Sequence, residues 1–104
     1  MAAYTALYSH RNALIDESES EGINRIIVYS AAEILDHVLR ERKTDLFLRI
    51  VEYNGKKVSA CVLENGYKVF AVFHSTEDER EEMKRLREIF REKVVRGEFN
   101  AFEF

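Results

Sequence analysis

Histidine is the side chain best suited to acid–base and metal chemistry near neutral pH, and this sequence has three, His10, His37 and His74. A helical metal site needs two histidines four residues apart, commonly as His-Glu-x-x-His, and no pair here has that spacing. We therefore interpret His37 and His74 as surface or boundary residues. A catalytic base at His74, beside Ser75, is the alternative interpretation.

The single cysteine, Cys61, is predicted to lie midway along a strand. One cysteine can form neither an internal disulfide nor a cysteine-based zinc site, and a buried free thiol behaves as a small hydrophobe. The four glycines form no phosphate-binding loop, and no Gly-x-Ser-x-Gly motif is present. The sequence therefore predicts no catalytic residue, no cofactor and no metal, and we expect a protein that is not an enzyme.

A basic stripe recurs at helical spacing near the end of the chain. Its members are Arg80, Lys84, Arg87 and Arg91. Glutamates flank the stripe at i+3 and i+4 positions, so ion pairs within the helix can neutralise it. The net charge of −3 also argues against nucleic-acid binding, which usually requires a positive excess. We favour a solvated, self-paired helix face, and nucleic-acid or nucleotide binding is the alternative.

The length of 104 residues suits one domain, and a hydrophobic share of 46% is too high for a disordered chain. No apolar run approaches the roughly 20 residues that span a bilayer, and the N-terminus lacks the pattern of a signal peptide. We therefore expect a cytoplasmic protein without membrane contact. The stretch 77–98, rich in Glu, Lys and Arg, is common in thermophile proteins and is also found in mesophile helices.

The N-terminal segment, residues 1–21, divides into an apolar part and an acidic loop. The apolar side chains of residues 1–15 have offsets that suit one face of a helix, and a strand followed by a loop is the alternative. Residues 16–22 are acidic and end in glycine, which indicates an exposed loop. Residues 22–104 are expected to form the α+β core of a single domain, 1–104.

A strand and a helix are expected next. Residues 23–29 are rich in β-branched side chains, which favours a strand. Ser30 and Glu33 have the spacing of a capping box, and the apolar stripe that follows predicts a helix over 31–43.

A second helix is predicted over 77–96. Thr76 and Glu79 again have capping-box spacing, and Gly97 stands where a glycine commonly ends a helix. The short aromatic tail, 98–104, is predicted to be extended.

Two Asn-Gly pairs, at 54–55 and 65–66, separate three strand-like runs. Asn-Gly favours the type I′ turn and is the strongest short-range hairpin signal. We therefore expect a three-stranded antiparallel meander over 46–53, 56–64 and 67–74. Together with the helices, this predicts an α+β fold in which an antiparallel sheet of three to five strands packs against two or three helices.

The two-residue turns fix the predicted register, which divides the side chains between two faces of the sheet. The predicted pairs include Val51 with Val58, Arg49 with Ala60, and Cys61 with Phe70. Both faces are largely apolar, whereas a solvated antiparallel sheet has one polar face. We therefore expect more apolar surface than one short chain can cover, and a docking surface on the sheet. The residues predicted to form that surface are Arg49, Phe47, Val58 and Phe73. The alternative to this docking role is that Arg49 snorkels past the sheet edge or pairs with an internal carboxylate.

Five segments follow the pattern of a known family: 22–27, 32–39, 42–48, 63–71 and 97–104. They resemble the PATAN family, named for the N-terminal domain of the PatA regulator. The resemblance covers roughly 22–104, departs from the family at Asp45, where a glycine is usual, and gives residues 1–21 no counterpart. It implies a non-catalytic module that binds other proteins in prokaryotic signalling, and it carries over no catalytic residue.

The leading hypothesis is a small, non-enzymatic, regulatory protein–protein interaction module that forms a homodimer. The apolar sheet and the absence of a catalytic constellation motivate it. Nucleic-acid binding through the basic stripe is the first alternative. A small enzyme with a site between subunits, using His74 or His10, is the second.

Overall fold

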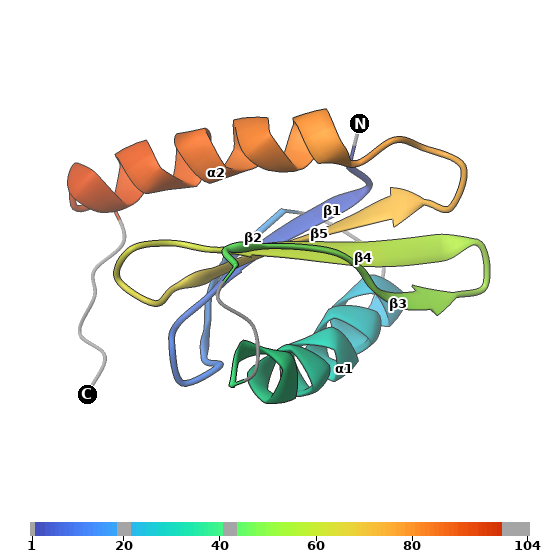
Figure 1. The fold of residues 1–104 in the computed structure, drawn as a ribbon. Helices are drawn as coiled ribbons and strands as arrows, with labels where there is room; N and C mark the ends of the chain where they lie inside the picture. Colours follow the sequence, from blue (N-terminus) through green and yellow to red (C-terminus); the bar gives the residue numbers. More distant parts are fainter. Residues whose placement is uncertain (1, 19–21, 41–43, 99–104) are drawn as a thin grey trace.

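The computed structural model describes residues 2–18, 22–40 and 44–98, and these form one five-stranded antiparallel sheet between two helices (Figure 1). The strands are β1 (Tyr4–Tyr8), β2 (Leu14–Glu17), β3 (Leu46–Tyr53), β4 (Lys56–Val62) and β5 (Lys68–His74). The helices are α1 (Gly22–Leu39) and α2 (Arg80–Val95). The predicted α+β class is confirmed, with the sheet at the upper end of the expected size.

The N-terminal segment supplies two of the five strands, in the sheet order β2-β1-β5-β4-β3. The helix prediction for residues 1–15 is therefore wrong, and the alternative of a strand and a loop was nearer. Four of the five β1 residues are buried, because β1 lies between two neighbours and has one helix on each face. Both N-terminal strands consequently belong to the sheet, and β1 contributes to the buried core.

Helix α1 begins at Gly22, so the strand prediction for 23–29 is wrong. Its buried residues recur with the period of a helix from one end to the other: Asn24, Ile27, Val28, Ala31, Ala32 and Leu35. Burial of this continuous stripe outweighs the β-propensity of the isoleucines. Ser30 is therefore inside the helix, where its hydroxyl donates to the Ile26 carbonyl at 3.3 Å, and the predicted capping box is wrong. The predicted end at 43 lies outside the described residues, and the helix ends at Leu39.

The first Asn-Gly hairpin is confirmed. Asn54 and Gly55 both have positive φ, of 50° and 78°, as a type I′ turn requires. Val51 pairs with Val58, as predicted. Further along the hairpin a bulge between Phe47 and Val51 places Phe47, and not Arg49, opposite Ala60.

The second hairpin has a register one residue away from the prediction, because Cys61 pairs with Val69 and not with Phe70. Its loop is closed by Leu63 N–H donating to the Tyr67 carbonyl at 2.8 Å, which leaves three residues in the turn. Only the last of them, Gly66, has positive φ, at 88°. A three-residue loop of this kind is a common alternative to the type I′ turn. Because the register is shifted by one residue, every β5 side chain lies on the opposite face of the sheet from the one predicted.

Helix α2 begins three residues later than predicted, at Arg80, and its N-cap residue, Glu79, makes no side-chain cap hydrogen bond. The Arg80 N–H donates to Asp78 Oδ1 at 3.1 Å. The predicted capping box is therefore wrong; Glu77 Oε1 instead accepts a hydrogen bond from the His74 N–H at 3.0 Å. Gly97 ends the helix with φ 73°, as predicted. The strand prediction for the tail falls on residues outside those described, apart from Glu98.

Each face of the sheet is covered by one of the chain's own helices (Figure 1). Helix α1 packs through Val28 and Leu35 against a layer that contains Phe70, and α2 packs through Met83 on the opposite layer. The expectation of an uncovered sheet face is therefore wrong. It failed because it treated 23–29 as a strand and so counted too little helix.

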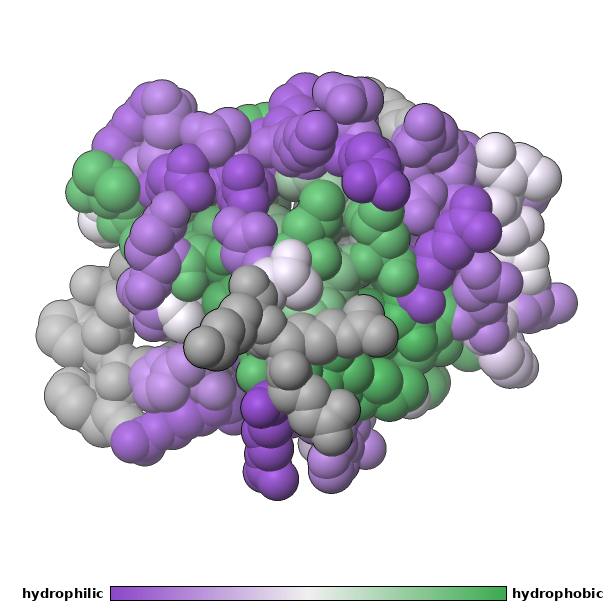
Figure 2. All heavy atoms as spheres, viewed as in Figure 1, coloured by the Kyte–Doolittle hydropathy of each residue, from purple (hydrophilic) through white to green (hydrophobic). Residues whose placement is uncertain are grey.

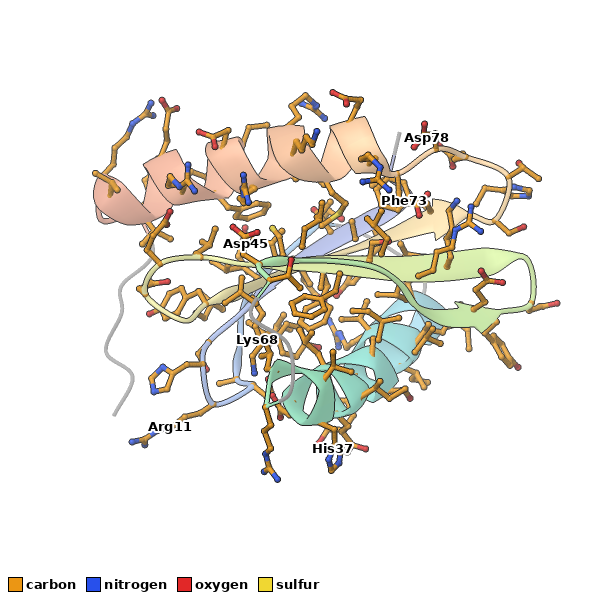
Figure 3. All side chains as sticks on the ribbon, viewed as in Figure 1. Arg11, His37, Asp45, Lys68, Phe73 and Asp78 are labelled. Atoms are coloured by element: carbon orange, nitrogen blue, oxygen red, sulfur yellow. The ribbon has the colours of Figure 1, made fainter. Side chains whose placement is uncertain are left out.

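Two lysines are buried inside these layers, and each is tied to one helix. Lys57 Nζ lies 2.7 Å from Glu79 Oε2, at the start of α2, and also donates to the backbone carbonyls of Ser75 and Glu77. On the other face, Lys68 Nζ lies 2.7 Å from Asp36 Oδ1 in the last turn of α1. Figure 3 shows the Lys68 side chain directed from the sheet toward α1.

The Lys57–Glu79 pair gives a stability prediction. Glu79→Gln leaves the Lys57 ammonium buried without its counter-charge, and breaking a buried pair in this way costs about 3–5 kcal/mol. We expect a loss of that size in the free energy of unfolding, measured by urea denaturation. The matched control is Glu81→Gln, because Glu81 is exposed and 3.8 Å from Lys84; its expected cost is about 0.5 kcal/mol or less. Equal losses in the two variants would contradict the prediction.

The same pair predicts an acid dependence. Burial alone would raise the pKa of Glu79, but the hydrogen bond and attraction of Lys57 outweigh it and hold the pKa below its ordinary value. Such a carboxyl contributes stability above its unfolded pKa of about 4.3, and the contribution is lost as the pH falls through the folded pKa. We expect unfolding free energy to fall below about pH 4.5, and to fall less steeply in Glu79→Gln. A profile equally steep in both proteins would contradict this.

Candidate interaction surface

Three of the residues predicted to dock a partner are buried within the chain. Phe47 and Val58 belong to the core beneath α1, and Phe73 belongs to the core beneath α2. Figure 3 shows Phe73 between the sheet and α2. They contact this chain's own helices, so they do not form an interaction surface in this structure.

Arg49 remains at the surface, at the bulge of β3. Its φ is 55°, its N–H donates to Ser59 Oγ at 3.1 Å, and its Nε lies 3.3 Å from Glu79 Oε1. In the structure, Arg49 therefore pairs with an internal carboxylate, that of Glu79, as the alternative interpretation of this residue predicted. Arg49 borders a polar hollow of about 610 Å³ formed with Leu48 and with residues 76–80.

Exposed apolar side chains gather where the outer side of α1 meets β3. We call this the α1–β3 patch. Its lining residues are the exposed Ile23, Ile26 and Tyr53, the partly buried Val51, the buried Ile27 and the polar Ser30. They line a shallow groove of about 270 Å³. Ile26 is 63% exposed and Tyr53 is 54% exposed, although both are large hydrophobic residues. Contiguous exposed apolar surface of this kind commonly marks a binding site.

The patch adjoins an edge of the sheet. β3 is the last strand in the order, so one side of its backbone has no strand partner among the described residues. Figure 2 shows hydrophobic side chains gathered between the hydrophilic α2 and the adjoining side of α1, over β3. An edge strand offers a row of backbone donors and acceptors to another chain.

This patch was not predicted from the sequence, because residues 23–29 were expected to form a strand and are part of α1. In a helix, Ile23, Ile26 and Ser30 lie on one line along the exposed side, with the next turn continuing at Ile34. One feature of the sequence could have indicated the patch: this segment has more apolar residues than one buried helical stripe needs. On α1, both Ile26 and its neighbour Ile27 are apolar, yet only Ile27 is buried.

The basic stripe of α2 is largely engaged by carboxylates, as the favoured interpretation predicted. Lys84 pairs with Glu81, and Arg91 lies 2.7 Å from Glu88. Partners also come from outside the helix, which the sequence did not show: Asp45 lies 2.6 Å from Arg87, and Glu64 lies 2.6 Å from Arg91. Arg80, the remaining member of the stripe, lines the polar hollow beside Arg49.

The side chains with catalytic potential do not converge. His10, His37 and His74 are all exposed, and they lie in the β1–β2 turn, on α1 and at the end of β5. Figure 3 shows His37 pointing away from the sheet. Cys61 is buried, and burial raises the pKa of its thiol to about 12, so it is a thiol at neutral pH. Within 2–18, 22–40 and 44–98, no three His, Cys, Asp or Glu residues are grouped as a metal site. Neither described helix could cross a membrane.

No family model and no curated protein matches this chain. Among solved structures, it is similar to a Roadblock/LC7 domain from Streptomyces avermitilis, with a TM-score of 0.69. The two chains are 11% identical, and the match covers 90% of this chain and 86% of the other. At this identity the similarity establishes the fold, a Roadblock/LC7-like α+β architecture. The resemblance to the PATAN family stays a prediction.

Neutralisation of the basic stripe predicts that the protein does not bind nucleic acid. In fluorescence anisotropy at low salt, we expect no salt-dependent binding to labelled single- or double-stranded RNA or DNA. The double variant Glu81→Lys/Glu88→Lys removes two neutralising charges and serves as the positive control, which should gain weak, salt-sensitive binding. Tight binding by the unaltered chain would overturn this interpretation.

Proposed function

We propose that this protein is a small, non-enzymatic, regulatory interaction module that acts in the cytoplasm and forms a homodimer through the α1–β3 patch. The observation that carries the proposal is the exposure of Ile26 and Tyr53 beside an unpaired sheet edge. Both helices have already buried their inner faces, so this apolar surface is not needed to complete the chain's own core.

A second copy of the chain is the partner that fits this surface best. In a twofold dimer the same patch is used by both subunits, so apolar side chains on α1 meet identical apolar side chains. The outer backbone of β3 can be satisfied at the same interface, which removes an exposed edge. A charged partner gains little here, because the groove is lined mainly by isoleucine, valine and tyrosine.

The fold comparison supports the same class of function. Roadblock/LC7 domains are small regulatory protein-interaction modules and are often dimeric. The PATAN resemblance independently implies a non-catalytic module that binds proteins. An enzyme with a site between subunits is less well supported, because the three histidines are dispersed and exposed.

The test is the oligomeric state of the full chain, measured by light scattering and sedimentation across micromolar concentrations. The unaltered protein is expected to dimerise. Ile26→Asp puts a carboxylate into the apolar patch, where desolvating it without a partner is costly, and should weaken dimerisation at least tenfold.

The matched control is Leu14→Asp. Leu14 is also an exposed aliphatic residue, but it lies on β2, at the opposite edge of the sheet. This variant should dimerise as the unaltered protein does. A strict monomer at high micromolar concentration, or a loss of dimer in Leu14→Asp alone, would overturn the proposed interface.

A further inference from the structure

The polar hollow beside Arg49 contains none of the residues of the α1–β3 patch. It lies between the bulge of β3 and the segment that leads into α2, on the side of the sheet that α2 covers. Its lining residues are Leu48, Arg49 and 76–80, and all except Leu48 are polar or charged. Its volume of about 610 Å³ falls within the range of small-molecule sites, roughly 300–1,000 Å³. A polar ligand of that size suits this hollow.

Arg49 brings a positive charge that the buried ion pair does not need. Lys57 Nζ lies 2.7 Å from Glu79 Oε2, so this carboxylate has a counter-charge without Arg49. Arg49 contacts the other oxygen through Nε, at 3.3 Å, and its two terminal nitrogens have no hydrogen-bond partner among the described residues. Its φ of 55° is rare for a side chain of this size, and such backbone positions are concentrated at ligand sites.

Arg80 brings a second available guanidinium to the same hollow. The other three members of the basic stripe each have a carboxylate within 4 Å. The exposed Arg80 side chain, by contrast, has no ion-pair partner within the part of the chain that the structure describes. A guanidinium presents its N–H groups in a planar fork that matches the oxygens of a phosphate.

The carboxylates that border the hollow are already engaged. Glu77 Oε1 accepts a backbone N–H at 3.0 Å, and Asp78 Oδ1 accepts the Arg80 N–H at 3.1 Å. Glu79 is the partner of Lys57. The hollow therefore offers an anion two guanidinium groups with unused donors, beside carboxylates whose charges are partly compensated.

We propose that this hollow binds a small polar molecule that carries a phosphate monoester, with Arg49 and Arg80 on the phosphate. A monoester is close to a dianion at neutral pH, since its second pKa is about 6, and so suits two arginines better than the singly charged diester of a nucleic acid. A bare phosphate would leave most of the hollow empty, whereas a sugar-like remainder can hydrogen-bond with Thr76 and Asp78. A nucleobase gains little, because Leu48 is the one apolar residue in the lining.

The experiment is isothermal titration calorimetry of the full chain at low salt. The probes are ribose monophosphate, free ribose and inorganic phosphate. We expect ribose monophosphate to bind more tightly than inorganic phosphate, free ribose to show no binding, and added salt to weaken the binding. Absence of binding by ribose monophosphate overturns the proposal. Equal affinities for ribose monophosphate and inorganic phosphate overturn the assignment of a larger polar ligand.

Two variants test the arginines. Arg80→Gln should weaken the binding of ribose monophosphate about tenfold or more, because it removes charge-assisted hydrogen bonds to the phosphate. Arg49→Gln should weaken it similarly and remain folded, because Lys57 still neutralises Glu79. Unchanged binding in either variant overturns the role of that arginine.

Two controls separate this site from other effects. Arg85→Gln removes an exposed arginine of the same helix that pairs with Glu82 and lies outside the hollow, so its binding should equal that of the unaltered protein. A loss as large as in Arg80→Gln would show a general charge effect and overturn the site. Ile26→Asp should bind ribose monophosphate normally, so failure of the proposed dimer and failure of this site are distinguishable.

Discussion

Cover of both faces of a single apolar sheet is the constraint on which the rest of this structure depends. The central strands β4 and β5 are buried along nearly their whole length, so neither face tolerates water. One amphipathic helix on each side meets that requirement, because each directs a continuous apolar stripe toward the sheet. The outer side of α2 is polar, whereas the outer side of α1 also carries exposed apolar residues. Strand β1 then lies inside the sheet, with one helix layer on each side of it.

Apolar burial holds the helices against the sheet, and the two buried lysines orient them. Lys57 reaches one layer and binds Glu79 at the start of α2, while Lys68 reaches the other layer and binds Asp36 near the end of α1. Non-directional apolar contacts permit a helix to slide or rotate at modest cost, whereas a buried charge accepts only a position that supplies its partner. Each helix is thus tied at one end to a buried lysine, and Arg49, at the bulge, adds a second cation to Glu79.

Because the helices cover both faces of the sheet, another protein can contact only the surface that the helices leave exposed. An exposed apolar surface lies at the β3 edge and on the outer side of α1, where Ile26 and Tyr53 face solvent. The predicted surface, centred on Phe47, Val58 and Phe73, required an open face, and these residues instead complete the core. The protein does expose apolar surface, as expected, but on α1 and β3 and not on a face of the sheet. The proposed docking role of this protein therefore depends on the α1–β3 patch and not on a bare face of the sheet.

The sequence by itself determined the local features that depend on a few neighbouring residues. It predicted the Asn54-Gly55 hairpin, the end of α2 at Gly97, burial of Cys61 and the pairing of the basic stripe. Tertiary structure decided whether 23–29 is helix or strand, because packing of the α1 stripe against the sheet outweighs the preference of β-branched residues. It also decided the β5 register, because a three-residue loop and a two-residue turn suit the same Asn-Gly pair, and only burial of the whole strand selects between them. The location of the proposed interaction surface follows from both outcomes, since it is part of the surface that remains after the helices have covered the sheet.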